Sequence, residues 1–353
     1  QLVAHYVRDV GVGRSSRLFP TMSGNNDEDR GYHSFMLIKG YVMPRKLFST
    51  MICCMLCYIA SAQYAANPGT MRLSKTRSGH YAFNTLCNHK LLTSVMIESG
   101  IHAALIDSSY FFSHKQELGV KVHPIDTEVM NGTINLGGIV YRITHLGKGK
   151  IKIPMGPVTY EGEILILANY ENDTPITIPI QRLKHSYDWN SHIVMLDIKS
   201  EEMRMLTHKE LRSWQGRRYK INRSTYKRMP AIRTTISFIS NGFKSELEGN
   251  FNIDLGNPML LYLLGNRPKV TELFESNGQI ALAPITYDPN GDISIQAFVP
   301  EQCDIMGNHF AKPTICVTNK FKRFTSEGLI GLGFLERHIV AFDFDNNYLY
   351  IKE

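Results

Sequence analysis

The sequence lacks the motifs of several common enzyme classes. It contains no His-Glu-x-x-His zinc motif, no Gly-x-Ser-x-Gly turn around a serine nucleophile, and no Gly-x-Gly-x-x-Gly dinucleotide fingerprint. A glycine-rich phosphate loop that ends in Lys-Ser or Lys-Thr is also missing, and the histidines are scattered. These absences argue against zinc peptidases, serine hydrolases, P-loop nucleotidases and NAD-dependent enzymes. The sequence therefore predicts neither a cofactor nor a metal site.

Long apolar runs are absent apart from one near the start of the chain. Arg45 and Lys46 precede an apolar stretch over 47–60, and Ala60-Ser61-Ala62 follows as a cleavage site. This order is typical of a secretory signal peptide over 43–62, and the stretch is too short for an ordinary membrane span. We expect a secreted or periplasmic protein whose mature chain has no membrane span. Residues 1–42 read as a disordered, non-native leader before a start at Met43, the alternative being a cytoplasmic extension before a signal anchor.

Cysteine is scarce outside this stretch. Three of the six cysteines fall within the predicted signal peptide, which leaves Cys87, Cys303 and Cys316. An odd number allows at most one disulfide and one remaining thiol. Cys303 and Cys316 are the favoured pair because they are close in sequence across an expected hairpin.

The chain has little excess charge once the leader is set aside. It contains 39 Lys and Arg against 32 Asp and Glu, for a net charge of +7. The densest basic patch, from Arg212 to Arg233, is interpreted as a solvated linker, with an anionic partner as the alternative. No nucleic acid is expected as a partner.

What the sequence does contain is short runs of strand character between glycine or proline residues. Examples are residues 138–144, 150–153 and 162–167, which are rich in β-branched side chains. Such runs predict an all-β fold of barrel-like lobes with a few short helices, expected over 199–204, 207–214 and 268–276. Lys148-Gly149 is read as a hairpin tip, either an ordinary surface hairpin or a flap over a cleft.

Two acidic turns are the most informative feature. Each ends an apolar run and contains an acid, one intervening residue and a glycine, namely Glu98-Ser99-Gly100 and Asp254-Leu255-Gly256. A strand that stops at such a turn points its carboxylate out of the sheet. Two such turns could therefore bring two carboxylates together, so that they share one proton and activate a water molecule. Taken alone, each motif is also an ordinary turn.

A second pair of matching segments lies in the same order along the chain. Residues 192–197 and 338–343 share the pattern His-Ile-Val-x-x-Asp, 146 positions apart, while the acidic turns are 156 positions apart. Two landmarks at similar offsets indicate a duplicated lobe, because solenoid repeats have periods of roughly 20 to 50 residues. His192 and His338 are interpreted as residues at strand edges.

On these residues the chain resembles the bilobal aspartic peptidases, the retropepsin-like and pepsin-like proteins that bacteria secrete. That family carries Asp-Thr/Ser-Gly once in each lobe and an apolar-apolar-glycine segment behind the acid. The resemblance covers residues 79–353 and is strongest at the end, where Leu329-Ile330-Gly331 follows Asp254. It implies an N-terminal β lobe over 79–215, a basic linker over 216–230 and a C-terminal β lobe over 231–353. It further implies Glu98 and Asp254 as catalytic residues, with a supporting set of Ser99, Gly100, Leu255, Gly256, Leu329, Ile330 and Gly331.

The departures from the family pattern make the acid pair degenerate. Glu98 is one methylene longer than the aspartate of the family, and Leu255 replaces a residue that carries a hydroxyl. The first lobe reads Pro175 to Gln181 where the apolar-apolar-glycine segment should lie, with no glycine. A misplacement of about 1 Å in a catalytic group can cost roughly 100-fold in rate.

Two functions therefore remain open. As a peptidase, Glu98 and Asp254 would hold the attacking water, one as a base and the other as an acid. As a catalytically inactive homologue, the protein would bind an extended peptide or a polymer without cleaving it. Either way, we expect a monomer with a peptide or protein ligand between the lobes.

Overall fold

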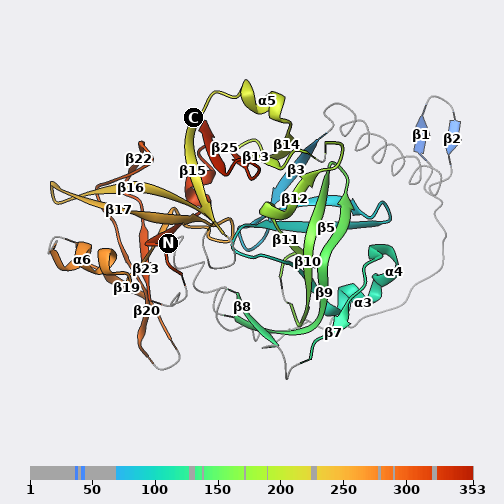
Figure 1. The fold of residues 1–353 in the computed structure, drawn as a ribbon, viewed down its shortest axis with the longest axis horizontal. Helices are drawn as coiled ribbons and strands as arrows, with labels where there is room; N and C mark the ends of the chain where they lie inside the picture. Colours follow the sequence, from blue (N-terminus) through green and yellow to red (C-terminus); the bar gives the residue numbers. More distant parts are fainter. Residues whose placement is uncertain are drawn as a thin grey trace. The chain divides into compact units, whose positions relative to one another are not determined.

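The computed structural model describes most of the chain after Asn67. The described residues are 36–38, 41–43, 69–126, 132–136, 139–170, 172–188, 190–223, 229–276, 280–288, 291–319 and 324–352. The chain divides into two units, Gln1–Asn67 and Pro68–Glu353 (Figure 1). In the first unit, β1 (Met36–Ile38) pairs antiparallel with β2 (Tyr41–Met43). These strands lie within the stretch 1–42 expected to be disordered, except for Met43, which begins the predicted signal peptide. The other residues of both stretches lie outside the described residues.

The second unit is built from two halves joined by a central sheet. The first half contains β3 (Thr70–Lys75), β4 (Tyr81–Cys87), β5 (Leu91–Glu98), β6 (Ala104–Asp107), α3 (Ser108–Ser113), α4 (Lys115–Leu118), β7 (His123–Pro124), β8 (Thr133–Leu136), β9 (Ile139–Met155), β10 (Val158–Ala168), β11 (Ile176–Pro179), the 3₁₀ turn η1 (Ile180–Arg182) and β12 (Leu183–His185).

The second half contains β16 (Pro230–Ser240), β17 (Phe243–Ile253), β18 (Leu261–Leu264), α6 (Pro268–Ser276), β19 (Ala283–Tyr287), β20 (Ile293–Phe298), β21 (Gln302–Ile305), β22 (Asn308–Ala311), β23 (Ile315–Thr318), β24 (Gly328–Ile330) and α7 (Leu332–Leu335). Strands thus dominate the unit, and the predicted all-β class is confirmed. No helix in the described part of the chain is long and apolar enough to cross a membrane.

The two halves pair their strands in the same order and in the same directions. In the first half, β4, β5, β11, β6, β10 and β9 are successive neighbours, with parallel pairs β5–β11 and β6–β10. In the second half, β16, β17, β24, β18, β23 and β20 are successive neighbours, with parallel pairs β17–β24 and β18–β23. Each acidic turn follows the corresponding strand of its half, β5 or β17.

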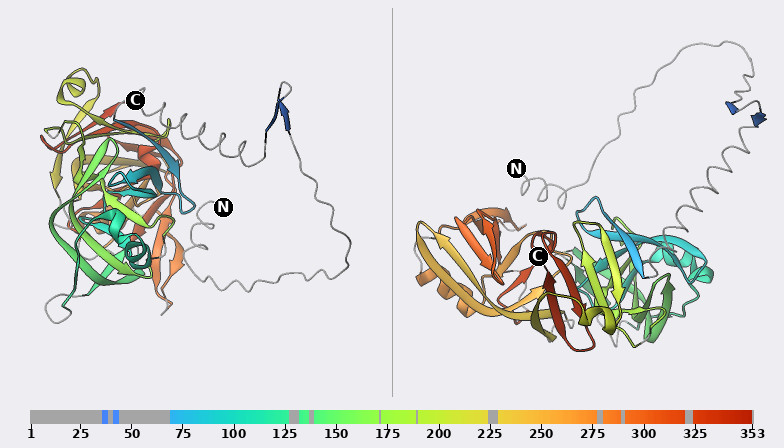
Figure 2. Two further views of the ribbon diagram at one scale, coloured as in Figure 1. Left: turned by 90° about the vertical axis from the view of Figure 1, so that its right-hand side faces the viewer. Right: turned by 90° about the horizontal axis from the view of Figure 1, so that it is seen from above.

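The central sheet combines strands from the middle of the chain with strands from its end. It is formed by β13 (Ile193–Asp197), β14 (Glu202–Leu206), β15 (Arg217–Arg223), β25 (Ile339–Asp343) and β26 (Tyr348–Lys352), with β3 at one edge. Figure 2 shows it between the halves. Its middle pair joins the two matching segments of the sequence, because Ile193 lies opposite Asp343 and Asp197 lies opposite Ile339. Helix α5 (His208–Arg212) packs Leu211 with Ile193 and Met195 of β13.

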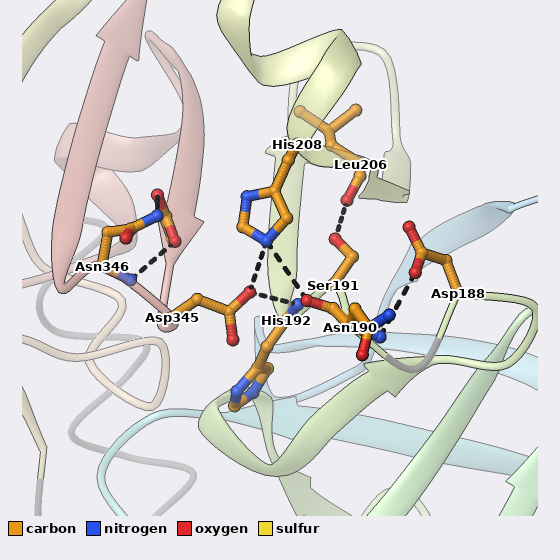
Figure 3. A network of polar contacts seen from close by, with 9 residues as sticks. Asp188, Asn190, Ser191, His192, Leu206, His208, Asp345 and Asn346 are labelled. Atoms are coloured by element: carbon orange, nitrogen blue, oxygen red, sulfur yellow. Dashed lines mark hydrogen bonds and ion pairs between the residues drawn. The ribbon is translucent and has the colours of Figure 1, made fainter.

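Polar contacts link β13 and α5 to the turn between β25 and β26 (Figure 3). A carboxylate oxygen of Asp345 accepts a hydrogen bond from the His192 amide at 2.8 Å and lies 3.2 Å from Nε2 of His208. Nε2 of His208 is also 3.2 Å from the backbone oxygen of Asn190. One carboxylate from the end of the chain thus contacts both the start of β13 and the start of α5.

Apolar burial continues through both halves. Fully buried side chains of the main core include Phe83 and Tyr160 from the first half and Phe238, Phe251 and Phe334 from the second. Tyr160 keeps its hydroxyl satisfied, because the oxygen accepts from the Ala104 amide at 2.8 Å. Burying this much apolar surface is the main favourable contribution to folding.

Several local expectations are wrong. Residues 199–204 form a turn and the start of β14 instead of a helix, and Glu201 adopts a φ of 56° there. Lys148 and Gly149 lie within β9, opposite an irregularity in β10, so they form no hairpin tip. The predicted helices near 207–214 and over 268–276 are present as α5 and α6. Within the predicted linker, residues 217–223 form β15, which buries Ile221.

The cysteine prediction also fails. Cys87, Cys303 and Cys316 are all buried free thiols. Cys303 lies on β21 opposite Phe238 and Phe310, whereas Cys316 lies on β23 opposite Tyr262 and Ala297. Proximity in sequence was misleading, because the two thiols belong to strands that are not neighbours in the sheet.

Candidate active site

The structure brings the two acidic turns together. Strand β5 ends at Glu98, and Asp254 follows the last residue of β17. A Cβ atom on Gly100 would lie 3.1 Å from both Oδ1 of Asp254 and Oε1 of Glu98. On Gly256 it would lie only 2.1 Å from Oε2 of Glu98. A side chain at position 256 would therefore displace the Glu98 carboxyl group, whereas one at position 100 would only crowd the two acids.

A strand behind each turn holds it in place. Ile330 of β24 lies opposite Ile253, and its oxygen accepts from the Asp254 amide at 2.9 Å. The neighbouring Gly331 cannot carry a side chain, because a Cβ atom would lie 2.3 Å from the backbone oxygens of Asn257 and Met259. The predicted segment Leu329-Ile330-Gly331 thus lies behind Asp254, with Leu329 opposite Asn252.

The first half places proline where the second half has this glycine. Ile178 of β11 lies opposite Ile97, just as Ile330 lies opposite Ile253. The next residue, Pro179, lies opposite Glu98 and so corresponds to Gly331. The chain then enters the 3₁₀ turn η1.

Ser99 connects the two turns through its hydroxyl group. Its Oγ donates to the backbone oxygen of Ile253 at 2.7 Å and accepts from the Leu255 amide at 2.9 Å. Ser99 is fully buried. A single side chain from the first half therefore satisfies one backbone group on each side of Asp254.

The reverse connection is missing. Leu255 is buried in the main core and has no hydroxyl to offer the first turn. The Ser99 amide, which is the counterpart of the Leu255 amide, instead donates to Oε1 of Glu98 at 2.8 Å. A hydroxyl group at position 255 would be placed to accept a hydrogen bond from the Ser99 amide, as Ser99 does from the Leu255 amide. Because that hydroxyl is missing, the longer side chain of Glu98 accepts the bond instead. The Ser99 amide thus links the two departures from the family pattern.

The carboxyl groups share a backbone donor. Oε1 of Glu98 accepts from the amides of Ser99 at 2.8 Å, Gly100 at 2.7 Å and Gly256 at 3.0 Å. Oδ1 of Asp254 accepts from the same Gly256 amide at 3.1 Å. Glu98 therefore reaches across to the turn of the other half, and the two acids meet at Gly256.

This proximity changes the acidity of Asp254. Burial of its carboxyl group, the neighbouring Glu98 charge and a hydrogen bond with Glu98 together raise the pKa of Asp254 well above its ordinary value. Glu98 itself is 8% exposed, while part of Asp254 remains accessible to solvent. A pair in which one carboxyl group keeps a proton beside a charged partner can act as an acid and a base together.

Two further residues at this site have no recognisable sequence signal. Nε2 of Gln181 donates to the backbone oxygens of Ser99 at 3.2 Å and Ile101 at 2.6 Å, so it supports the first turn. His80, in the turn between β3 and β4, places Nε2 3.1 Å from the backbone oxygen of Gly256. In the part of the chain that the structure describes, no group of three or more His, Cys, Asp or Glu side chains could hold a metal ion.

Comparisons with known proteins give likenesses of fold only. No protein-family model matches the chain, and no curated protein matches it. One similar solved structure is Basic 7S globulin from soybean, at 10% identity and a TM-score of 0.45, covering 80% of this chain and 94% of that chain. Another is an aspartic proteinase from Irpex lacteus, at 11% identity and a TM-score of 0.48, covering 80% of this chain and 96% of that chain. At these values the likenesses carry no argument about the activity of this chain.

Proposed function

We propose that this protein hydrolyses peptide bonds with the acid pair Glu98 and Asp254. The observation that carries this proposal is the Gly256 amide, which donates to both carboxyl groups at 3.0 and 3.1 Å. Two carboxyl groups in such proximity favour a state with one shared proton. The matching strand order of the two halves supports a common origin for them, as the repeated segments suggest.

Each acid has a distinct role in the proposed reaction. The three amides that donate to Oε1 of Glu98 stabilise a negative charge there, which suits the base. The raised pKa of Asp254 suits the acid. Glu98 takes a proton from water while the water oxygen bonds to the peptide carbonyl carbon, and Asp254 protonates the carbonyl oxygen. Glu98 then passes its proton to the amide nitrogen while ionised Asp254 takes a proton from a hydroxyl of the gem-diol, so that the C–N bond breaks, a carboxylic acid and an amine leave, and both acids return to their starting states.

The proposed substrate is an extended peptide or a protein bound between the two halves by a secreted, monomeric enzyme. A backbone in extended form can hydrogen-bond to strand edges without a particular sequence. Any preference for particular substrate side chains would come from the residues around the two turns.

A second candidate is an inactive homologue that only binds the peptide, as the site departs from the family pattern. The contact of Oε2 of Glu98 with Gly256 favours this alternative, because the longer acid reaches over the second turn. Leu255 adds to it by removing one of the two hydroxyl groups that would fix the geometry. In that case the cleavage step is lost, while a peptide still binds.

The test compares the wild type with Asp254→Asn and Glu98→Gln on an acid-denatured protein substrate across pH 3 to 7. Because neither amide can share the proton, we expect each variant to lose at least about 100-fold in rate. A pepstatin-like inhibitor should block the wild-type cleavage, since cleavage that ignores it would indicate a contaminant. Equal rates in wild type and Asp254→Asn would overturn the proposal.

A repaired variant separates the two candidates. Glu98→Asp with Leu255→Thr restores the shorter acid and supplies the second hydroxyl group. If wild type is silent but binds the inhibitor, the binding function is favoured, and activity in the repaired protein would show which changes removed catalysis. If the repaired variant is folded and silent, Pro179 becomes the next position to change, because it occupies the place of Gly331.

A further inference from the structure

The two halves connect their acidic turns to the segment behind them in different ways. In the second half, the Gly331 amide donates to the Leu260 oxygen at 3.1 Å. The Leu332 amide donates to the oxygen of Asn257, the third residue after the acid, at 2.7 Å. Two backbone amides thus connect this loop to the segment that follows β24.

Proline changes this connection in the first half. Pro179 occupies the place of Gly331 and has no N–H group, so it cannot donate as Gly331 does. Proline also carries a Cβ atom, whereas a Cβ atom at position 331 would lie 2.3 Å from the oxygens of Asn257 and Met259. With proline at position 179, the segment behind the first turn cannot approach that turn as closely.

The side chain of Gln181 makes the corresponding connection. The oxygen of Ile101, the third residue after the first acid, corresponds to the oxygen of Asn257 in the second half. It accepts a hydrogen bond from Nε2 of Gln181 at 2.6 Å. A side-chain amide thus donates to the oxygen whose counterpart accepts from the backbone amide of Leu332.

The second hydrogen bond from Gln181 acts on the peptide unit that holds Glu98. Nε2 also donates to the Ser99 oxygen at 3.2 Å. This oxygen belongs to the same peptide unit as the Gly100 amide, which donates to Oε1 of Glu98 at 2.7 Å. A donor on the oxygen of a peptide unit orients its N–H group and strengthens the bond which that group makes. The contact therefore directs the Gly100 amide at the proposed base.

The surroundings of Gln181 fix the orientation of its amide group. The residue is 8% exposed, and Oε1 has no hydrogen-bond partner in the part of the chain that the structure describes. Turning the amide group over would place Oε1 against two backbone oxygens, which only accept hydrogen bonds. Nε2 of Gln181 therefore faces the first turn.

We propose that Gln181 is a positioning residue of the acid pair, whose side-chain amide replaces the backbone connection that Pro179 prevents and so holds Glu98 in place. This inference rests on the proposed function, because Glu98 is the base of that reaction. The glycine missing from the first half is then compensated two positions later in the sequence.

A pair of isotope labels isolates the peptide unit that Gln181 contacts. The sequence contains three Ser-Gly pairs, at 23–24, 78–79 and 99–100. Full-length protein with ¹³C in the serine carbonyl group and ¹⁵N in glycine therefore gives correlated NMR signals from these three pairs alone. Ser23→Ala and Ser78→Ala each remove one of the other two signals, which assigns the third.

The variant that removes the donor is Gln181→Leu. The Ser99 carbonyl signal should move upfield because it loses a hydrogen bond, and the Gly100 amide proton should move upfield because its own bond weakens. The matched control is Gln302→Leu, which removes a side-chain donor to Asp304 in the second half and should leave both signals unchanged.

Catalysis provides a readout that a purely stabilising contact would not change. Where wild type cleaves substrate, kcat of folded Gln181→Leu should fall about tenfold with KM unchanged, the equivalent of one hydrogen bond. Pro179→Gly with Gln181→Gly gives the first half the glycine spacing of Gly331 and Gly333. That double variant should be several-fold faster than Gln181→Gly alone, because the segment behind the turn can then approach it.

An unmoved Ser99 carbonyl signal in folded Gln181→Leu would overturn the inference. An equal movement in Gln302→Leu, or a folded double glycine variant no faster than Gln181→Gly, would also overturn it. The NMR measurement needs no catalysis. A moved signal together with a silent wild type would therefore reject the proposed function and keep the contact of Gln181 with the turn. Cleavage by wild type with an unmoved signal in Gln181→Leu would do the reverse.

Discussion

The two acidic turns have the same strand pairing beside them but different side chains, and each difference in side chain offsets the other. The second turn receives both of its connections from Ser99, which contacts the Ile253 oxygen and the Leu255 amide. The first turn receives none from Leu255, and Glu98 satisfies the Ser99 amide itself. A site that looks damaged in two places is thus better described as one exchange, in which a longer acid replaces a missing hydroxyl group.

The largest expected effect comes from filling the space between the turns. Gly256→Ala would bring a methyl group within 2.1 Å of Oε2 of Glu98, whereas Gly100→Ala would meet its nearest atoms at 3.1 Å. We expect the free energy of unfolding to fall by about 3 kcal/mol for Gly256→Ala and by about 1 kcal/mol for Gly100→Ala. Denaturant titration of both variants measures the difference.

A background without Glu98 provides the control. In Glu98→Ala protein the atom that clashes is gone, so adding Gly256→Ala should cost less than about 1 kcal/mol. Equal losses in the two glycine variants would contradict the difference between the turns.

Removing the hydroxyl group of the first turn should have the next largest effect. Ser99→Ala would leave the Ile253 oxygen and the Leu255 amide without their buried partner. We expect a loss of about 2 kcal/mol, since each unsatisfied buried group costs roughly 1 kcal/mol or more. Ser94→Ala on the same strand, β5, is the matched control and should stay within about 0.5 kcal/mol of wild type. If both serine variants unfolded alike, the connection between the turns would be of no energetic importance.

The raised pKa of Asp254 predicts how stability depends on pH. The folded protein holds this proton more tightly than the unfolded chain, in which the pKa of Asp is about 3.9. The stabilisation is therefore fully present below that value and is lost as pH rises through the raised pKa, by up to about 1.4 kcal/mol per pH unit. Asp254→Asn should flatten this slope in thermal unfolding between pH 4 and the raised pKa. A slope as steep as that of wild type would show that Asp254 does not carry the proton.

The smallest expected effect tests whether Glu98 replaces the hydroxyl group that is missing at position 255. Because the Ser99 amide can donate to Glu98 or to a hydroxyl group at position 255, Glu98→Asp and Leu255→Thr should be non-additive. We expect the double variant to be about 1 kcal/mol more stable than the sum of the single changes predicts. Additive free energies of unfolding would mean that the two departures are independent.

The sequence predicted the parts of the fold that depend on local chemistry. Short β-branched runs bounded by glycine or proline predicted the all-β class, and the short helix expected over 268–276 is present as α6. The turn at Glu201 was misread as a helix, because a tight connection with positive φ has no strong composition signal. Which strands become neighbours depends on contacts between distant segments, which a local pattern does not encode. The predicted disulfide between Cys303 and Cys316 was wrong for this reason, because their strands are not neighbours in the sheet.

For the site, the repeat was the useful signal. Glu98 and Asp254 were selected because each occupies the same place within a half, and the structure brings them to one shared amide; their catalytic role stays a prediction. Gln181 and His80 were missed because both act on backbone oxygens, of Ser99 and Gly256, far away in the sequence. Every residue type has a backbone oxygen, so the sequence does not indicate which of these oxygens a distant side chain contacts.

The pairing of β13 with β25 has the symmetry of a homodimer. Ile193 lies opposite Asp343 and Asp197 lies opposite Ile339, so each strand presents the shared Ile-Val-x-x-Asp pattern to an antiparallel copy of that pattern. Identical strands related by a two-fold axis pair in this way between subunits. A chain with only one of the halves would already carry an edge suited to a second copy of itself. The match between β13 and β25 does not depend on the two strands being in one chain. The covalent connection between the halves raises the effective concentration of each strand around the other.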